Sequence, residues 1–356
     1  MSAEVQFYLV ILLVYGCVAL ISCWGLDLQF GDTGILNFAF IVFQAVGAYT
    51  AALLTLGPVE TGVFGKMQEY FWGADLPFPV PVLVAAGVGA LLSVPIGFVA
   101  LRRLRSDYQA VAMLAVSLIA TTMMVASPGF VGGQLGLYAI PQPFEDSFAL
   151  SSTEATWAYL GFCIACVAVV GWIVVRISRA PLGRTLRAIR EHPDAAAALG
   201  INLTAVRMGA FVVGNALAAL SGALLIQFIG AYSTNDWLFP ETFILLAAVI
   251  IGGSGNKFGV MLGVLLLPVG LSEAVRYLPS IIRPGLIHQL QFIVLGMMIL
   301  AFLWFRPTGL CPERRRRFDV DGRARPSLAF GGTWLGLQRG SLKRTRRPAD
   351  ASAEVL

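Results

Sequence analysis

One charge-dense interval, residues 176–207, separates two runs that are too apolar to be anything but membrane spans. The interval carries six arginines together with Glu191 and Asp194. Charges at this density lie outside lipid, because a single one at the bilayer centre costs about 3 kcal/mol on insertion scales. The chain must therefore cross a membrane on both sides of this interval and present it to the aqueous phase, where we expect a partner to contact it.

The composition and the distribution of basic residues fix the fold class. Hydrophobic residues make up 57% of the 356 residues and charged residues 13%, with a mean hydropathy of +0.78. Irregular backbone does not face lipid, so we expect an all-α, polytopic transmembrane helical bundle of about eight to ten spans, including broken or re-entrant segments. No Lys or Arg occurs in residues 106–175 or 232–241, so the positive-inside rule places stretches 127–153 and 232–241 outside the cell.

The charged interval itself predicts two short helices on the cytoplasmic face. Pro181 suits the first turn of a helix, and the following residues alternate apolar and basic side chains with helical period until Pro193 stops the helix. Asp194 is then expected to cap a second short helix that ends at Gly200.

Two polar, Gly-rich breaks interrupt the apolar sequence, at residues 25–34 and 252–259. The apolar run before the second break, residues 242–251, is too short to cross a bilayer, which needs about 20 helical residues. Such breaks either line a translocation route, where protein or water satisfies the backbone, or are ordinary loops between helices. The candidate route residues are Asp32, Asn37, Gly252, Gly253 and Asn256.

The sequence contains no constellation of residues that would support catalysis. Its two histidines, His192 and His288, are far apart, and there is no P-loop and no pair of carboxylates within a span. Cys163 and Cys166 have the spacing of a redox or metal site, but they lie in the middle of an apolar run with no histidine nearby, which favours buried hydrophobic side chains. We therefore predict neither a catalytic residue nor a metal site. An ion-coupled carrier is disfavoured, because Asp27 and Asp32 are expected at membrane interfaces rather than inside the bundle.

Five short motifs resemble, in the same order, those of one transporter family. The most specific is Gly-Arg-Thr-Leu-Arg-Ala-Ile-Arg-Glu at residues 183–191, followed by an alanine run, Leu199 and Gly200. It resembles the cytoplasmic loop of permease subunits of branched-chain amino acid ABC transporters, the LivM-type family. The other four motifs begin at residues 31, 101, 132 and 305. Asp32 departs from the family pattern, which has an aromatic or other uncharged residue there, and this leaves the substrate open.

The resemblance implies a permease subunit of an ABC importer, which passes a small amino-acid-like solute, foremost branched-chain amino acids, inward from an external solute-binding protein. Energy would come from separate cytoplasmic ATP-binding subunits, so this chain would hold no cofactor. A second, homologous permease subunit and multi-pass insertion into the lipid of a bacterial-type inner membrane are also implied, with no role for nucleic acid. The closely similar permeases for urea and short amides are the alternative.

In the family, the cytoplasmic loop is taken to dock into a groove of the ATPase. The resemblance thus implies that loop 178–205 makes this contact within a transmembrane domain of residues 1–310. The coupling residues would be Gly183, Arg184, Arg187, Ala188, Arg190, Glu191 and Gly200.

The end of the chain differs from the rest in composition. Residues 312–356 carry eleven Lys or Arg against five Asp or Glu, and they have too few clustered apolar side chains to form a core. We therefore expect residues 311–356 to be a basic, disordered cytoplasmic tail.

Overall fold

The structure is a computed structural model that describes residues 3–57, 70, 72–103, 106–144, 152–271, 273–274, 284–306 and 308–312. Within these residues the secondary structure is helical and no strand is formed. The chain divides into two units, residues 1–314 and 315–356. Apart from Cys311 and Pro312, the tail expected at residues 311–356 lies outside the described residues, so its disorder stays a prediction.

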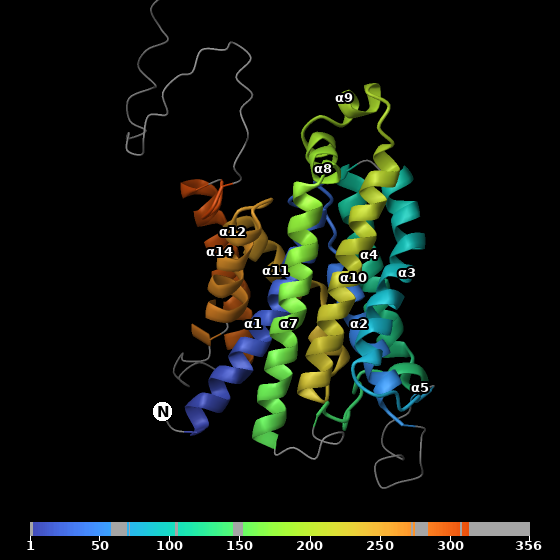
Figure 1. The fold of residues 1–356 in the computed structure, drawn as a ribbon, viewed down its shortest axis with the longest axis vertical. Coiled ribbons are helices and arrows are strands. Elements are labelled where there is room, and N and C mark those ends of the chain that lie inside the picture. The colour runs from blue at the N-terminus through green and yellow to red at the C-terminus, as the bar shows by residue number, and fades with distance from the viewer. Residues whose placement is uncertain are drawn as a thin grey trace, which may run out of the picture. The chain divides into compact units, whose positions relative to one another are not determined.

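The first unit is a bundle of helices that lie side by side (Figure 1). The elements are α1 Ala3–Gln29, α2 Phe40–Thr55, α3 Val80–Arg103, α4 Ser106–Ala126, α5 Pro128–Val131, α7 Ser152–Arg179, α8 Pro181–Glu191, α9 Pro193–Ala198, α10 Leu203–Ile229, the 3-10 helix η1 Thr234–Trp237, α11 Phe239–Gly252, α12 Lys257–Val264, the π-helical segment η2 Leu265–Leu271 and α14 Pro284–Phe305.

Five of the described helices, α1, α3, α4, α7 and α10, are long and apolar enough to cross a membrane. Shorter apolar helices accompany them, among them α2, α11 and the segment formed by α12 and η2. With 14 residues, α11 is too short to span a bilayer on its own, as its sequence predicts. The predicted polytopic helical bundle with broken segments is confirmed.

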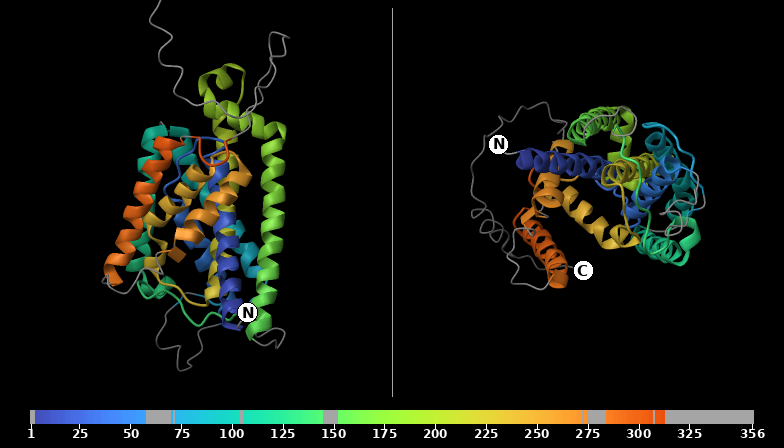
Figure 2. Two further views of the ribbon diagram at one scale, coloured as in Figure 1. Left: turned by 90° about the vertical axis from the view of Figure 1, so that its left-hand side faces the viewer. Right: turned by 90° about the horizontal axis from the view of Figure 1, so that it is seen from below.

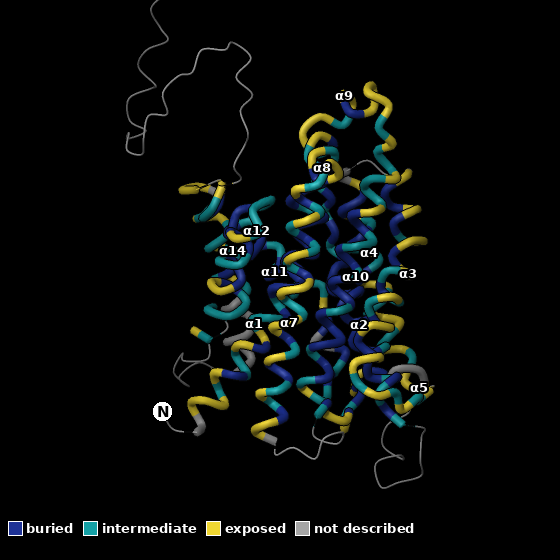
Figure 3. Tube along the Cα trace, viewed as in Figure 1, coloured by how far each residue is buried: buried dark blue, intermediate teal, exposed yellow. Residues whose placement is uncertain are grey.

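Helix α10 lies at the centre of the bundle, where it packs against α1, α2 and α3. In the most apolar stretch of α10, 67% of the residues are buried within the protein, whereas in that of α4 the share is 22%. Figure 3 shows the same contrast, with buried residues concentrated on α2 and α10 and exposed ones on α3 and α7. Because the exposed residues of α3, α4 and α7 include many large hydrophobic side chains, these three helices face the lipid.

Small residues let α1 and α10 approach closely. A Cβ atom added to Gly25 of α1 would lie 2.8 Å from the carbonyl oxygen of Gly214 in α10, closer than real Cβ atoms approach. Close backbone contact of this kind holds helices together in lipid, where the hydrophobic effect between helices is absent. The glycine therefore serves helix packing.

Two details of the predicted secondary structure are wrong. Residues 25–29 were expected to lie in a non-helical break, but α1 continues to Gln29, because Gly25, Asp27 and Gln29 face other helices and not lipid. The second cytoplasmic helix, α9, begins at Pro193 with His192 at the N-cap position, so Asp194 lies in its first turn and is not its cap.

The arginines indicate which end of the bundle is cytoplasmic. Helices α8 and α9 lie at one end, and the N-terminus and α5 lie at the other (Figure 1). Arg102 lies in the last turn of α3 and Arg176 in the last turn of α7, at the end that carries α8. The positive-inside rule makes this end cytoplasmic. Viewed from the opposite end, α1 crosses the bundle obliquely and α14 stands at its edge (Figure 2).

At the external end, the motif beginning at residue 132 packs against the turn after α10. An isolated bridge joins Leu137 to Tyr232, and the Thr234 hydroxyl donates to the Gly133 carbonyl at 2.6 Å. Burial and, to a lesser extent, the nearby Tyr49 raise the pKa of Tyr232 well above its ordinary value. The motif thus forms a folded external cover.

Candidate functional site

Helix α8 is held against the bundle by its apolar face. Leu186 and Ile189, three residues apart, are 1% and 0% exposed, and Leu186 packs against Leu28 of α1 and Ala210 of α10. Burying a side chain of this size contributes about 1.5–3 kcal/mol. Gly183 allows the sharp entry, because a Cβ there would lie 2.7 Å from the Ile177 carbonyl oxygen. Helix α8 is therefore a fixed part of the bundle.

Two of its arginines turn inward. Arg187 donates to the carbonyl oxygens of Ser178 at 2.5 Å and Gly183 at 3.1 Å, which ties α8 to the end of α7. Arg190 donates to the carbonyl oxygen of Gly31. The latter contact joins α8 to the chain directly after α1, so both guanidinium groups position the helix.

The opposite face of the α8–α9 region points to water. Arg184, Ala188 and Glu191 are exposed on α8, and Gly200, with φ +81°, ends the second helix as predicted. Leu199 beside it is 82% exposed. This face combines opposite charges with an exposed leucine and is available to a macromolecular partner.

Beneath α8, buried charged side chains join the first Gly-rich break, residues 25–34, to the second, residues 252–259. Asp27 and Asp32 are both 0% exposed. The Nζ of Lys257, at the start of α12, lies 2.6 Å from Asp27 Oδ2 and 2.7 Å from Asp32 Oδ2. These three residues, here called the charged cluster, join the end of α1 to the start of α12.

Further polar contacts complete the charged cluster. The Gly255 amide donates to Asp27 Oδ1 at 2.8 Å, and the Ser178 hydroxyl donates to Asp32 Oδ2 at 3.0 Å. A Cβ on Gly31 would lie 2.6 Å from the Gly255 nitrogen, so only glycine fits between the two breaks. Removing one partner of such a buried pair is strongly destabilising, because a charge is left without compensation.

Comparison with known proteins identifies the family. Residues 8–303 match the model of the family described as "Branched-chain amino acid transport system / permease component". The chain belongs to this family. It is 30% identical over 327 residues to the high-affinity branched-chain amino acid transport system permease protein LivM of Salmonella typhimurium, covering 86% of this chain and 70% of LivM. No solved structure matches the chain.

Two further relatives show the breadth of the similarity. The permease protein LivH of Salmonella typhimurium is 28% identical over 302 residues, covering 80% of this chain and 88% of LivH. The nucleoside ABC transporter permease protein NupC of Lactococcus lactis is 28% identical over 254 residues, covering 68% of this chain and 74% of NupC. The chain is thus an ABC transporter permease of the branched-chain amino acid type, and it is a multi-pass protein of the inner (plasma) membrane.

In this permease, the seven predicted coupling residues separate into two groups. Arg184, Ala188, Glu191 and Gly200 are exposed on the α8–α9 face. Gly183, Arg187 and Arg190 instead hold α8 in place through close packing and hydrogen bonds. The predicted contact with an ATPase stays a prediction for the first group, and the second group can affect it only by positioning the helix.

The predicted route residues lie within packed regions of the permease. The side-chain amide of Asn37, 3% exposed, donates to Gln29 Oε1 at 2.9 Å and to Asn215 Oδ1 at 3.0 Å. This amide cluster joins the end of α1, the segment before α2 and the middle of α10. Asn37 therefore has a structural role in this conformation, and its place on a route stays a prediction.

Backbone hydrogen bonds from residues 310 and 311 hold the start of the second break, residues 252–259, in place. Leu310 donates from its backbone to the Ile251 carbonyl at 2.8 Å, and Cys311 donates to the Gly252 carbonyl at 3.1 Å. The side chain of Asn256 accepts from Phe258 N at 3.2 Å and so caps α12. Gly252, Gly253 and Asn256 thus shape a tight turn at the cytoplasmic end.

The expected position of Asp27 and Asp32 needs correction. They lie inside the protein at its cytoplasmic end, because Lys257, the Gly255 amide and the Ser178 hydroxyl bind their carboxylates. Sequence reasoning missed Lys257. The one signal for it in the sequence was that the second break, residues 252–259, contains a single cation, whereas the first break, residues 25–34, contains two anions.

The site joins the exposed helix to both breaks by direct contacts. Arg190 binds Gly31, Asp32 binds Lys257, and Lys257 begins α12. A displacement of α8 would therefore act on both breaks together. Among the described residues, no group of three His, Cys, Asp or Glu side chains could hold a metal ion.

Proposed function

We propose that this permease is the membrane-spanning subunit of an ABC importer that passes branched-chain amino acids inward. The proposal rests on the two different faces of helix α8. Its inner face is fixed to the ends of α1 and α7, and its outer face presents Arg184, Ala188 and Glu191 to the cytoplasm. Separate ATP-binding subunits dock on this outer face and on α9.

The partners follow from the relatives and from the geometry. LivM and LivH are both named as permease proteins of branched-chain amino acid transport systems, and this chain is similar to both. A second, homologous permease subunit therefore pairs with this chain, and an external binding protein delivers the solute to the cover near Leu137. Movement of the ATP-binding subunits displaces α8, and the charged cluster passes the displacement to α12.

Two other solute classes are alternatives within the same transporter type. Permeases for urea and short amides share the motifs of this chain, and NupC is named as a nucleoside permease. These solutes carry no charge, whereas an amino acid carries an ammonium and a carboxylate group. The similarity to LivM over most of the chain favours the amino acid.

Uptake into proteoliposomes tests the proposal. The complete transporter, with ATP-binding subunits, second permease and binding protein, is supplied with radiolabelled L-leucine, urea or adenosine. We expect ATP-dependent uptake of leucine alone. Leaving out the ATP-binding subunits should abolish the uptake, and leucine uptake that persists without them would indicate an ion-coupled carrier instead. ATP-driven uptake of urea or adenosine without leucine would contradict the proposed solute.

A further inference from the structure

The span formed by α12 and η2 is held in different ways in its two halves. A Cβ on Gly263 of α12 would lie 2.9 Å from the Ala248 carbonyl carbon, so α12 packs closely against α11. The Lys257 side chain is bound in the charged cluster, and the Lys257 carbonyl oxygen accepts from Trp24 Nε1 at 3.1 Å. The cytoplasmic half of the span is therefore fixed.

The external half of the span is a less regular helix. The seven residues of η2 form a π-helix that contains Pro268, which has no N–H group to donate. π-helical turns occur mostly as short bulges in α-helices and frequently at functional sites, and sharp kinks occur at proline and at such bulges. Leu265 and Leu266 are 53% and 40% exposed, so this half faces the lipid. The span can therefore bend at η2 while α12 stays in place.

A side-chain contact holds the external end of the span against α1. The hydroxyl of Tyr8, in the second turn of α1, donates to the carboxylate of Glu273, which lies just beyond η2. We call this contact the external latch, because the N-terminus of α1 lies at the external end of the bundle (Figure 1). Between the latch and α12, a Cβ on Gly16 would lie at an ordinary van der Waals distance, 3.6 Å, from Val269 Cγ2. The packing of η2 on α1 is thus looser than that of α12 on α11.

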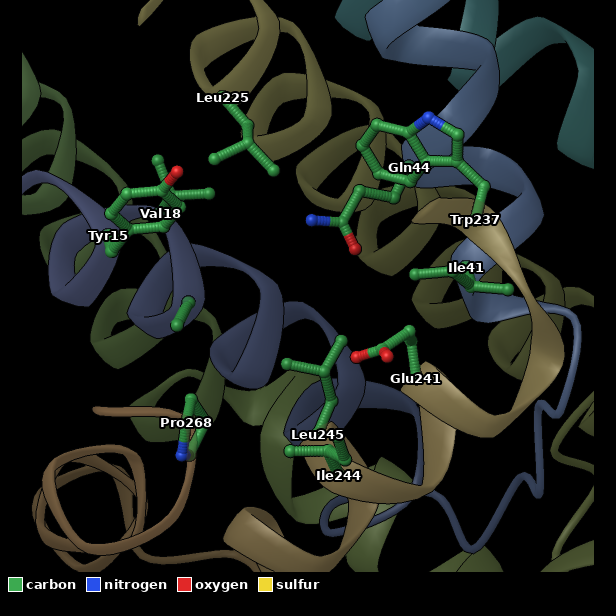
Figure 4. A pocket seen from close by; sticks show the side chains of 11 residues that line it. Tyr15, Val18, Ile41, Gln44, Leu225, Trp237, Glu241, Ile244, Leu245 and Pro268 are labelled. Atoms are coloured by element: carbon green, nitrogen blue, oxygen red, sulfur yellow. The ribbon is translucent and has the colours of Figure 1, made fainter. Parts of the chain in front are cut away.

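A cavity of about 220 Å³ lies among α1, α2, α10, η1, α11 and η2. Pro268 of η2 lies on its wall, together with Tyr15 and Val18 of α1 and Gln44 of α2 (Figure 4). Val18 is 3% exposed and Gln44 is 6% exposed, so solvent has little access to these side chains. Because η2 forms part of the wall, a movement of η2 away from α1 would open the cavity.

A simpler explanation for the external latch is that it only holds the N-terminal end of α1 in the fold. Tyr70 offers a matched comparison, because its hydroxyl donates to the Gly57 carbonyl oxygen at 2.9 Å in the connection between α2 and α3. Tyr70 is not among the residues that line the cavity. Removing the hydroxyl from each tyrosine therefore separates a loss of local stability from the opening of a gate.

We propose that η2 is the external gate of the cavity. Tyr8 holds the gate closed through Glu273, and release of this latch lets the span bend at Pro268 and admit solute from outside. Hinge closure of this kind is a common way to enclose a ligand. The gate rests on the proposed function, because an importer has to admit its solute from the external side.

Labelling of a cysteine in the cavity wall tests the gate. Val18→Cys is placed in the complete transporter in spheroplasts, in a permease whose five native cysteines are replaced by alanine, and a membrane-impermeant maleimide is added outside. Removing a hydrogen bond to a carboxylate shifts a two-state equilibrium about tenfold, so Tyr8→Phe should raise the labelling rate about tenfold. Tyr70→Phe should leave the labelling rate unchanged. ATP hydrolysis by the purified transporter reports assembly and should be the same in all variants.

Cross-linking of η2 to α1 gives a second test. Tyr8→Cys and Glu273→Cys, joined by a short bis-methanethiosulfonate reagent, should lose leucine uptake in proteoliposomes, and dithiothreitol, which cleaves the reagent, should restore it. Thr55→Cys with Gln227→Cys is the matched control, because Gln227 Nε2 donates to Thr55 Oγ1 between the external ends of α2 and α10. The control pair should keep its uptake when it is joined.

Each outcome decides one of the two proposals. Equal labelling of Val18→Cys with and without Tyr8→Phe would overturn the gate, and so would undiminished uptake by the cross-linked latch pair or loss of uptake in both cross-linked pairs. Faster labelling together with lost ATP hydrolysis would also overturn it, because it would show unfolding. Labelling does not depend on the solute, so a wild type that takes up urea or adenosine without leucine would overturn the proposed function alone.

Discussion

The permease satisfies its buried polar side chains differently in two places. In the charged cluster, Asp27 and Asp32 have the ammonium group of Lys257 within 2.7 Å, and both are 0% exposed. In a cavity of about 220 Å³ among α1, α2, α10 and α11, Gln44 is 6% exposed, and its Oε1 lacks a donor among the described residues (Figure 4). The protein supplies the charged cluster with its own cation, whereas the described residues supply no donor to the amide oxygen in the cavity.

The difference distinguishes polar groups that hold the fold together from one that is left without a donor among the described residues. A buried ion pair whose partners come from distant segments holds those segments in one arrangement, and it is costly to break. A buried amide oxygen without a donor gains a hydrogen bond when a donor group enters beside it. We therefore assign the charged cluster to the coupling of α8 with α12.

The largest expected effect comes from removing the cation of the charged cluster. Lys257→Met leaves two buried carboxylates without compensation and should lower the free energy of unfolding by about 3–5 kcal/mol. Unfolding of the detergent-solubilised permease by sodium dodecyl sulfate, followed by circular dichroism, measures it. The exposed Arg102 at the cytoplasmic end of α3 gives the control Arg102→Met. Equal stability of the two variants would show that the cluster does not hold the breaks together.

A smaller effect is expected in the cavity. Gln44→Leu removes an amide whose Oε1 has no donor among the described residues, and replaces it by an apolar side chain of similar size, so the free energy of unfolding should change by less than about 1 kcal/mol. The same unfolding measurement should therefore place this variant near the wild type. A loss of stability as large as that of Lys257→Met would mean that the Gln44 amide is held by partners within the protein, and the contrast between the two places would disappear.

Much of the fold could be predicted because its determinants are local. The long apolar runs predict the spans by length and composition, and Pro181, Pro193 and Gly200 mark the limits of α8 and α9 to within a residue or two. The Gly-rich sequence of residues 252–259 likewise predicts the turn between α11 and α12. In each case the physical cause lies within a few residues of its effect.

The site could be predicted only in part, because its contacts join distant positions. Lys257 and Asp27 are 230 residues apart in the chain, and no periodicity indicates which buried charge finds which partner. The Arg187 side chain turns inward because it donates to a carbonyl group at the end of α7. The sequence alone could not distinguish it from the exposed Arg184, because both arginines lie on the same short helix.

Two exposed leucines test directly whether the α8–α9 face receives the ATP-binding subunits. Leu199 at the end of α9 is 82% exposed, and Leu135 in the external cover is 77% exposed. Leu199→Asp should abolish co-purification of the ATP-binding subunits and ATP-driven leucine uptake while membrane insertion stays normal, and Leu135→Asp should leave co-purification unchanged. Full retention of the ATP-binding subunits by Leu199→Asp would contradict the claim.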